Sequence, residues 1–351
     1  MSQPEPSAGQ TSNTSTVGST TGFLAFGDTG YITKKPKGSG LVPVAAAMKE
    51  FCRTEDCRFA VMLGDNIYPD GADGSSADAQ RFEDTLIKPY SDLGGTDENF
   101  RIYPALGNHD WDTSRVGAFA QISFLENTRP FFMDGPFYSV RPVDGNNQVE
   151  IFVIDTQMIL AAEKGQAAWE KKDRHKSMNA YPQNEKEKGQ LIWLENALEA
   201  SSAKWKIVTS HHSLWESNGG KARQGKILRR LLLPILCNKA DAYFAGHQHT
   251  LELHEDDCST VLSGEDVKPL VHIVSGAAAK SRSVKPKFMA KQKAAYPQMR
   301  TVWARGDVWG FTHVELTDET MTVRVFSMPE KESDPTQMTE VFSHSFANRV
   351  D

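Results

Sequence analysis

The chain has 351 residues, of which 39% are hydrophobic and 24% are charged. This balance, with a mean hydropathy of −0.47, is typical of a soluble globular protein and excludes a fibrous or largely disordered chain. The formal net charge of −6 argues against a protein that binds nucleic acid through a basic face. The longest apolar runs, such as Phe59–Leu63, have the length of a strand, so we expect no membrane span.

The first 21 residues are rich in Ser, Thr, Gly, Pro and Gln, and they lack the apolar core and basic start of a signal peptide. This composition is typical of a disordered leader, or of the first stretch of an exported protein whose signal peptide has been removed. We therefore expect residues 1–21 to be a disordered leader and residues 22–351 to form a single domain. We predict export to the periplasm or out of the cell, with the cytoplasm as the alternative.

Strand and helix patterns alternate along most of the chain. In chain order we predict strand Phe23–Phe26, helix Val42–Phe51, strand Phe59–Leu63, helix Gln80–Ile87, strand Ile102–Leu106, strand Glu150–Ile154, helix Lys188–Glu199, strand Lys206–Thr209, helix Ile227–Leu236 and strand Ala242–Ala245. The part from Leu270 to Phe326 is mostly of β pattern. Alternating elements followed by a β-rich end indicate an α/β fold with more than one sheet.

The four cysteines match none of the spacings that are typical of zinc sites. They are Cys52, Cys57, Cys237 and Cys258. Two interpretations stay open: four buried thiols, or disulfides that join Cys52 to Cys57 and Cys237 to Cys258. The redox state of the compartment decides between them.

Polar side chains recur where predicted strands end. Open α/β sheets bind ligands at this edge, because the connections converge there while the strands hold them rigid. Singly, each cluster has an ordinary structural explanation, such as a helix cap or a hydrogen-bonded core histidine. Five clusters in series are better explained by function: Asp28, Asp65 with Tyr68, Asn108 with His109, His211 with His212, and His247 with His249.

These side chains offer carboxylate, phenol, amide and imidazole donors. Hard oxygen ligands mixed with imidazole suit iron, manganese or zinc rather than copper or a sulfur-bound metal. There are enough donors for two ions if one carboxylate bridges them, and a two-metal site suits displacement at phosphorus.

The sequence blocks GDTG, GDNIY, GNHD, VTSH and GHQH resemble, in order, the five blocks of the purple acid phosphatases. That family belongs to the calcineurin-like metallophosphoesterases, and within it this chain resembles the small, mammalian-type tartrate-resistant acid phosphatases. The resemblance extends over residues 23–346. It implies one metallophosphoesterase catalytic domain, a four-layer α/β/β/α sandwich of two mixed sheets flanked by helices. It also implies an acid phosphatase that hydrolyses small phosphate monoesters by attack of a metal-bound hydroxide.

The resemblance also implies how the metals are held. One ion would take Asp28, Tyr68 and His249, Asp65 would bridge, and the second ion would take Asn108, His211 and His247. The wider superfamily has a histidine where this chain has Gly30, and Tyr68 is the extra ligand here. A phenol favours a trivalent ion, so we expect Fe(III) beside a divalent Fe, Zn or Mn ion. Such an iron–tyrosinate pair gives the family its purple colour.

Substrate residues follow from the same resemblance. His109 would bind the phosphate and donate a proton. His211 lies in the VxxH register of the family's ligand, which leaves His212 as the fallback ligand or as a substrate contact. Mammalian-type members place a second substrate histidine where this chain offers Asn218, which can hydrogen-bond but cannot act as an acid.

Two other functions stay open: a Mn- or Zn-dependent phosphodiesterase of the same superfamily, and an inactive protein that binds metal or phosphate. Two basic runs, Lys164–Lys176 and Lys280–Lys291, also require an explanation. We favour a solvated surface for both over a lid that attracts acidic substrates.

Overall fold

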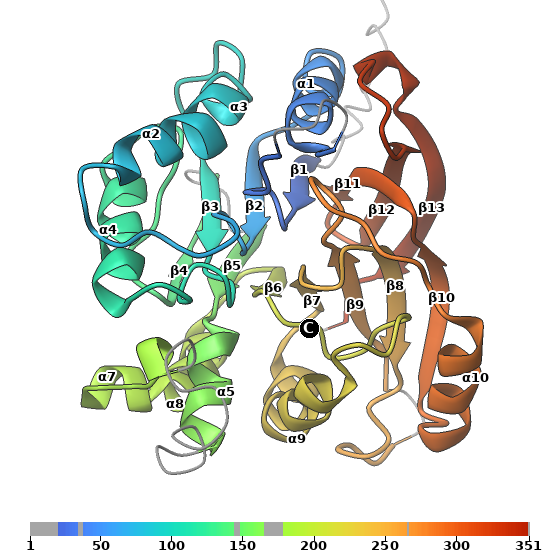
Figure 1. Cartoon of the computed structure of the whole chain (residues 1–351). Coiled ribbons are helices and arrows are strands. Elements are labelled where there is room, and N and C mark those ends of the chain that lie inside the picture. Colours follow the sequence, from blue (N-terminus) through green and yellow to red (C-terminus); the bar gives the residue numbers. More distant parts are fainter. Residues whose placement is uncertain (1–19, 34–37, 144–147, 165–177, 265–266, 350–351) are drawn as a thin grey trace, which may run out of the picture.

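Two β-sheets lie face to face at the centre of the molecule, with helices on their outer sides (Figure 1). The structure, a computed structural model, describes residues 20–33, 38–143, 148–164, 178–264 and 267–349. Residues 1–19 of the predicted leader and nearly all of the Lys164–Lys176 run lie outside these ranges. The first strand begins at Thr21.

The first sheet has the strand order β13-β12-β11-β1-β2-β3. Three neighbouring strands are parallel: β1 (Thr21–Phe26), β2 (Phe59–Leu63) and β3 (Ile102–Ala105). The others are antiparallel: β11 (Val308–Leu316), β12 (Thr320–Pro329) and β13 (Thr339–Ala347). β1 and β2 are buried along their whole length, which explains why they are continuous apolar runs in the sequence.

The second sheet has the order β10-β8-β9-β7-β6-β5-β4. Its centre is parallel: β5 (Val149–Val153), β6 (Trp205–Thr209), β7 (Ala242–Ala245) and β9 (Leu270–Ser275). Antiparallel strands complete it: β4 (Tyr138–Val140), β8 (Leu251–Asp256) and β10 (Met299–Arg305).

Helices cover the outer face of each sheet (Figure 1). Over the first sheet lie α1 (Leu41–Phe51), α2 (Asp78–Phe82), the π-helical turn η1 (Glu83–Ile87), α3 (Lys88–Tyr90) and α4 (Arg115–Glu126). Over the second lie α5 (Thr156–Lys164), η2 (Met178–Ala180), α7 (Glu185–Lys188), α8 (Gln190–Ala200) and α9 (Ala222–Lys239). Near the end of the chain are α10 (Pro286–Ala295) and η3 (Pro335–Gln337).

Successive side chains of a strand point to opposite faces of its sheet, so one strand contributes to two hydrophobic cores. In β5, Ile151 and Val153 belong to the main core, while the intervening Phe152 packs in a second core with α8 and α9. Across the interior, the rings of Phe23 and Phe244 from opposite sheets lie 5.8 Å apart. The predicted sandwich of two mixed sheets flanked by helices is therefore confirmed.

The predicted elements match the observed ones closely where the pattern is strong. Strands Phe59–Leu63 and Ala242–Ala245 are found with the predicted bounds. Helix α9 extends well beyond the predicted Ile227–Leu236 at both ends. We did not predict α4 or α5, because their apolar positions are interrupted by polar residues that hydrogen-bond inside the fold, such as Gln121 of α4.

Both open disulfide pairings are present. Cys52–Cys57 joins the end of α1 to the start of β2, and Cys237–Cys258 joins α9 to the connection after β8. Disulfides persist mainly in oxidising compartments, so they are consistent with export. Among the described residues, every helix is too short or too polar to cross a bilayer.

Candidate metal centre

The parallel strands of both sheets end at one place, and their connections carry the candidate ligands. Asp28, Asp65 and Asn108 follow β1, β2 and β3 of the first sheet. His211 and His247 follow β6 and β7 of the second sheet. The two-sheet arrangement thus brings together residues that are more than 200 positions apart in the chain.

Four of the candidate ligand residues have positive φ angles, which residues other than glycine rarely adopt. The φ values are 58° at Asp28, 55° at Asp65, 69° at His247 and 54° at His249. A left-handed backbone costs a non-glycine residue about 1 kcal/mol. Hydrogen bonds hold these turns, for example from the Asp28 N–H to the Gly64 carbonyl at 3.0 Å. Strain concentrated at one point indicates a functional constraint.

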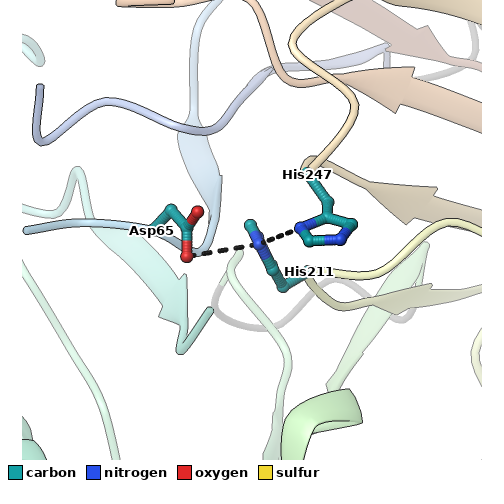
Figure 2. A group of neighbouring side chains, drawn as sticks. All are labelled: Asp65, His211 and His247. Carbon is teal, nitrogen blue, oxygen red and sulfur yellow. Dashed lines mark hydrogen bonds and ion pairs between the residues drawn. The ribbon is translucent and has the colours of Figure 1, made fainter. Parts of the chain in front are cut away.

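One half of the centre consists of Asp65, His211 and His247, and Figure 2 shows the two imidazoles and the carboxylate in a row. His211 Nε2 lies 3.2 Å from Asp65 Oδ1 and 2.9 Å from His247 Nδ1. His211 Nδ1 donates to the Leu63 carbonyl at 2.8 Å, and His247 Nε2 donates to the Gln224 amide oxygen at 3.1 Å. In their neutral forms, both histidines therefore present a lone pair to the same point, as metal-binding histidines do.

Burial and the neighbouring charges shift the pKa values of these two histidines in opposite directions. Burial lowers the pKa of His211, but the charge of Asp65 outweighs it and raises the pKa to about 9. Burial and the neighbouring imidazoles of His212 and His211 hold the pKa of His247 well below its usual range. Binding of a metal ion by these two imidazoles requires their neutral forms, so it is coupled to proton release from His211.

The second half consists of Asp28, Asp65, His249 and Tyr68. The Tyr68 hydroxyl lies 2.6 Å from Asp65 Oδ2, 3.0 Å from Asp28 Oδ1 and 3.2 Å from His249 Nε2. His249 Nε2 is 3.1 Å from Asp28 Oδ1. Burial, together with the charges of Asp28 and Asp65, raises the pKa of Tyr68 well above its usual range. The phenol therefore keeps its proton unless a highly charged cation displaces that proton.

Asp65 belongs to both halves, and in each the ligand atoms lie within 4.8 Å of one another. Burial alone would raise the pKa of Asp65, but the charges of His211 and His109 hold it below its usual range. The Asn108 amide oxygen nearby is buried and has no hydrogen-bond partner among the described residues. An orphaned oxygen, paired carboxylates and inward-facing lone pairs fit two cations that share Asp65.

A buried carboxylate holds two of the ligand connections together. Asp110 accepts hydrogen bonds from the backbone N–H groups of Asn66 at 3.0 Å, Ile67 at 3.1 Å and Gly107 at 2.7 Å. Burial raises its pKa to about 7, and the charge of Asp65 adds to this. Asp110 is the last residue of the GNHD block, but it is not among the predicted site residues. The sequence alone does not show that this carboxylate accepts hydrogen bonds from the backbone of two ligand-bearing connections.

His109 stands at the rim of the centre. Its side chain is 29% exposed, and its Nε2 lies 3.9 Å from Asp65 Oδ2. Its Nδ1 donates to the Pro69 carbonyl, which leaves Nε2 as the ring nitrogen on the side of Asp65. The His109 and Tyr68 rings are 4.3 Å apart.

The two other substrate candidates are occupied by protein contacts. His212 is fully buried, its ring lies 4.3 Å from that of His247, and its Nδ1 is 2.9 Å from the Thr156 hydroxyl. The Asn218 amide donates to both oxygens of Gln248, at 3.1 and 3.0 Å, and accepts from the Gly220 N–H. Both residues lie in the connection after β6, where they shape the loop; substrate binding by either stays a prediction.

The predicted solvated surface at Lys280–Lys291 is correct only for part of the run. Lys287 and Lys291 are exposed on α10, as expected. Lys280, however, is half-buried, and its ammonium lies 4.5 Å from the centroid of the Tyr68 ring. The sequence carries no periodic signal for this position, because it lies in an irregular connection.

Comparison with known proteins places the chain in a family. The family model of the calcineurin-like phosphoesterases matches residues 22–251. The chain belongs to this family. Among solved structures, GAP50, the anchor in the inner membrane complex of Plasmodium, superposes with a TM-score of 0.64 at 17% identity, covering 95% of this chain and 89% of that one. PhoD superposes with a TM-score of 0.57 at 13% identity, covering 94% and 73%. These likenesses support the fold alone.

Curated relatives within the phosphoesterase family are acid phosphatases. Tartrate-resistant acid phosphatase type 5 of Mus musculus is 27% identical over 309 residues, covering 86% of this chain and 85% of the relative. Purple acid phosphatase 17 of Arabidopsis thaliana is 31% identical over 242 residues, covering 68% and 63%. The resemblance seen in the five sequence blocks is thereby confirmed.

The shared carboxylate of this phosphoesterase gives a first prediction. We expect Asp65 to bridge two ions, so in an Asp65→Ala variant the affinity for both ions should fall together by at least about 10–100-fold. Metal analysis after dialysis measures the change. Asp73→Ala, which removes an exposed carboxylate from the same connection, is the control. Retention of two tightly bound ions by Asp65→Ala would contradict the bridging assignment.

Proposed function

We propose that the chain is a dinuclear metal enzyme, an acid phosphatase that hydrolyses small phosphate monoesters. One observation carries the proposal: the buried Asp65 carboxylate is common to two groups of ligand-type side chains. Two ions that share one carboxylate lie close enough to act on a single phosphoryl group. The acid phosphatase relatives support the same activity.

The ligand assignment is part of the proposal. Asp28, Tyr68 and His249 would hold Fe(III), and Asn108, His211 and His247 a divalent Fe, Zn or Mn ion, with Asp65 between them. When bound, the ions would supply positive charge that polarises the phosphoryl oxygens and lowers the pKa of the attacking water. Asp28, Asp65 and Tyr68 supply three negative charges against five positive, so the centre attracts an anionic substrate in an acidic protein.

Gly30 supports the choice of Tyr68 as an iron ligand. A Cβ atom at Gly30 would lie 2.1 Å from the Asn66 carbonyl oxygen, so no side chain fits there without moving the backbone. A histidine ligand at this position is therefore excluded sterically. The Tyr68 hydroxyl instead approaches both carboxylates, and its raised pKa means that only a strongly charged ion removes its proton.

His109 is the proposed proton donor. Its partly exposed position and the hydrogen bond at Nδ1 leave Nε2 directed toward Asp65. From there Nε2 can hold the phosphate and give a proton to the leaving oxygen.

We also infer export of the protein, which the disulfides Cys52–Cys57 and Cys237–Cys258 support.

Turnover of esters by metal-loaded protein tests the proposed function. We expect 4-nitrophenyl phosphate to be hydrolysed with a kcat/KM at least about tenfold above that for bis(4-nitrophenyl) phosphate. The reverse preference would favour the phosphodiesterase, and no turnover of either ester would favour the inactive binding protein.

Replacing His109 tests the proton donor. His109→Ala should keep its metal and lose rate by on the order of 10²–10⁴-fold on an alkyl phosphate. The loss should be smaller on 4-nitrophenyl phosphate, because nitrophenolate leaves without a proton. Steady-state kinetics with both substrates measures the difference. Equal losses on the two substrates would exclude proton donation.

The visible spectrum tests Tyr68. Oxidised protein should absorb in the visible, and Tyr68→Phe should be bleached, because the absorption requires a phenolate on Fe(III). Tyr31→Phe is the matched control, since its ring lies 6.0 Å from that of Tyr68 and is not a proposed ligand. A visible band that survives in Tyr68→Phe would overturn the iron–tyrosinate assignment.

A further inference from the structure

The edge of strand β13 is open. β13 lies at the end of the first sheet, and among the described residues it pairs with β12 on one side only (Figure 1). In an antiparallel strand, alternate residues direct their N–H and C=O groups away from the paired neighbour. Along the nine residues of β13, these groups form a row that the backbone of another strand can pair with.

The other three sheet edges are protected in ways that β13 is not. β4 has only three residues, and β3 has four, of which one is Pro104. Phe131 also forms a bridge to β3. β10 is interrupted by a register shift, carries Arg300 and Arg305, and lies against α10. β13 contains no proline, lysine or arginine, and its register shift, beside Val341, lies before its regular part.

The regular part of β13 is palindromic. From Phe342 to Phe346 the sequence is FSHSF, which is symmetric about His344. Ser343 and Ser345 are exposed, whereas the two phenylalanines and the histidine are half-buried and pair with core residues of β12. A two-fold interface requires a surface that is complementary to itself, and a palindromic strand meets this condition.

The core side of the open edge carries a row of aromatic rings. The Phe342 ring lies 5.1 Å from the ring of Trp303, which belongs to β10 of the second sheet. The His344 ring lies 4.7 Å from that of Phe346. The rings of β13 are only partly covered by this packing. Aromatic pairs across antiparallel strands are stabilising, so a second such row beside this one would bury more apolar surface.

We propose that the protein forms a two-fold symmetric dimer in which β13 pairs antiparallel with β13 of a second copy, centred on His344. In this register each Phe342 lies opposite Phe346 of the second copy, and each Ser343 lies opposite Ser345 of the second copy. The first sheet then continues across both copies. One strand pair is small beside the roughly 800 Å² per partner of a typical stable interface, so we expect dissociation in the micromolar range.

Sedimentation velocity of the full chain, over a concentration series from micromolar to submillimolar, tests the dimer. We expect the sedimentation coefficient to rise from that of a monomer to that of a dimer. In His344→Lys, two ammonium groups would lie opposite each other, and the dissociation constant should rise by at least about fivefold. His344→Asp should weaken the dimer for the same reason. Gln337→Lys, an exposed charge just outside the strand, should leave the dissociation constant unchanged within about twofold.

Mixing the two charged variants separates specific pairing from general damage to the strand. An equimolar mixture of His344→Lys and His344→Asp should restore the dimer, because an ammonium group then faces a carboxylate across the axis. Circular dichroism establishes that each variant is folded.

Three results would overturn the proposal: a chain that stays monomeric at the highest concentration, a dimer that both variants leave unchanged, or folded variants whose mixture does not dimerise. A monomeric chain that dimerises once residues 2–19 are removed would show that this segment, and not a second copy, occupies the edge of β13. That result would also contradict the dimer of the full chain.

Discussion

The structure depends on a buried carboxylate, Asp65, that touches donors from both sheets. Its oxygens contact the hydroxyl of Tyr68, the backbone N–H of His109 and the Nε2 of His211. Burial of a charge is costly, and the fold offsets it with positive and hydrogen-bonding neighbours. Two of these neighbours, the Tyr68 hydroxyl and the His211 imidazole, are also proposed metal ligands, so the groups that make the buried charge tolerable are of the kind that binds cations.

This constraint explains the rigidity of the surroundings. Asp28, Asp65, His247 and His249 have left-handed backbones, which persist only where the surrounding structure fixes them. Asp110 supplies part of that fixation by tying the connection after β2 to the one after β3. The two sheets bring the remaining ligand-bearing connections to the same place. The surrounding packed structure holds the four residues in their strained backbone conformations.

Charge is arranged in shells around this point. Carboxylates and a phenol lie at the centre, imidazoles beside them, and Lys221, Lys280 and Arg282 outside. The chain carries a formal net charge of −6, so attraction of an anionic substrate depends on cations gathered locally at this centre.

The sequence by itself determined the strands, the order of the five motif blocks and hence the family, because buried parallel strands are continuous apolar runs that end in recognisable polar turns. It therefore located Asp28, Asp65 and His211 at the carboxyl ends of strands, which the structure assigns to two sheets. Only the tertiary structure decided which side chains face inward: Asn218 and His212 are engaged by loop contacts, and Lys280 leaves a basic run to lie on Tyr68. The physical reason is that periodicity fixes the faces of strands and helices, whereas side chains in irregular connections take their direction from long-range contacts between the two sheets.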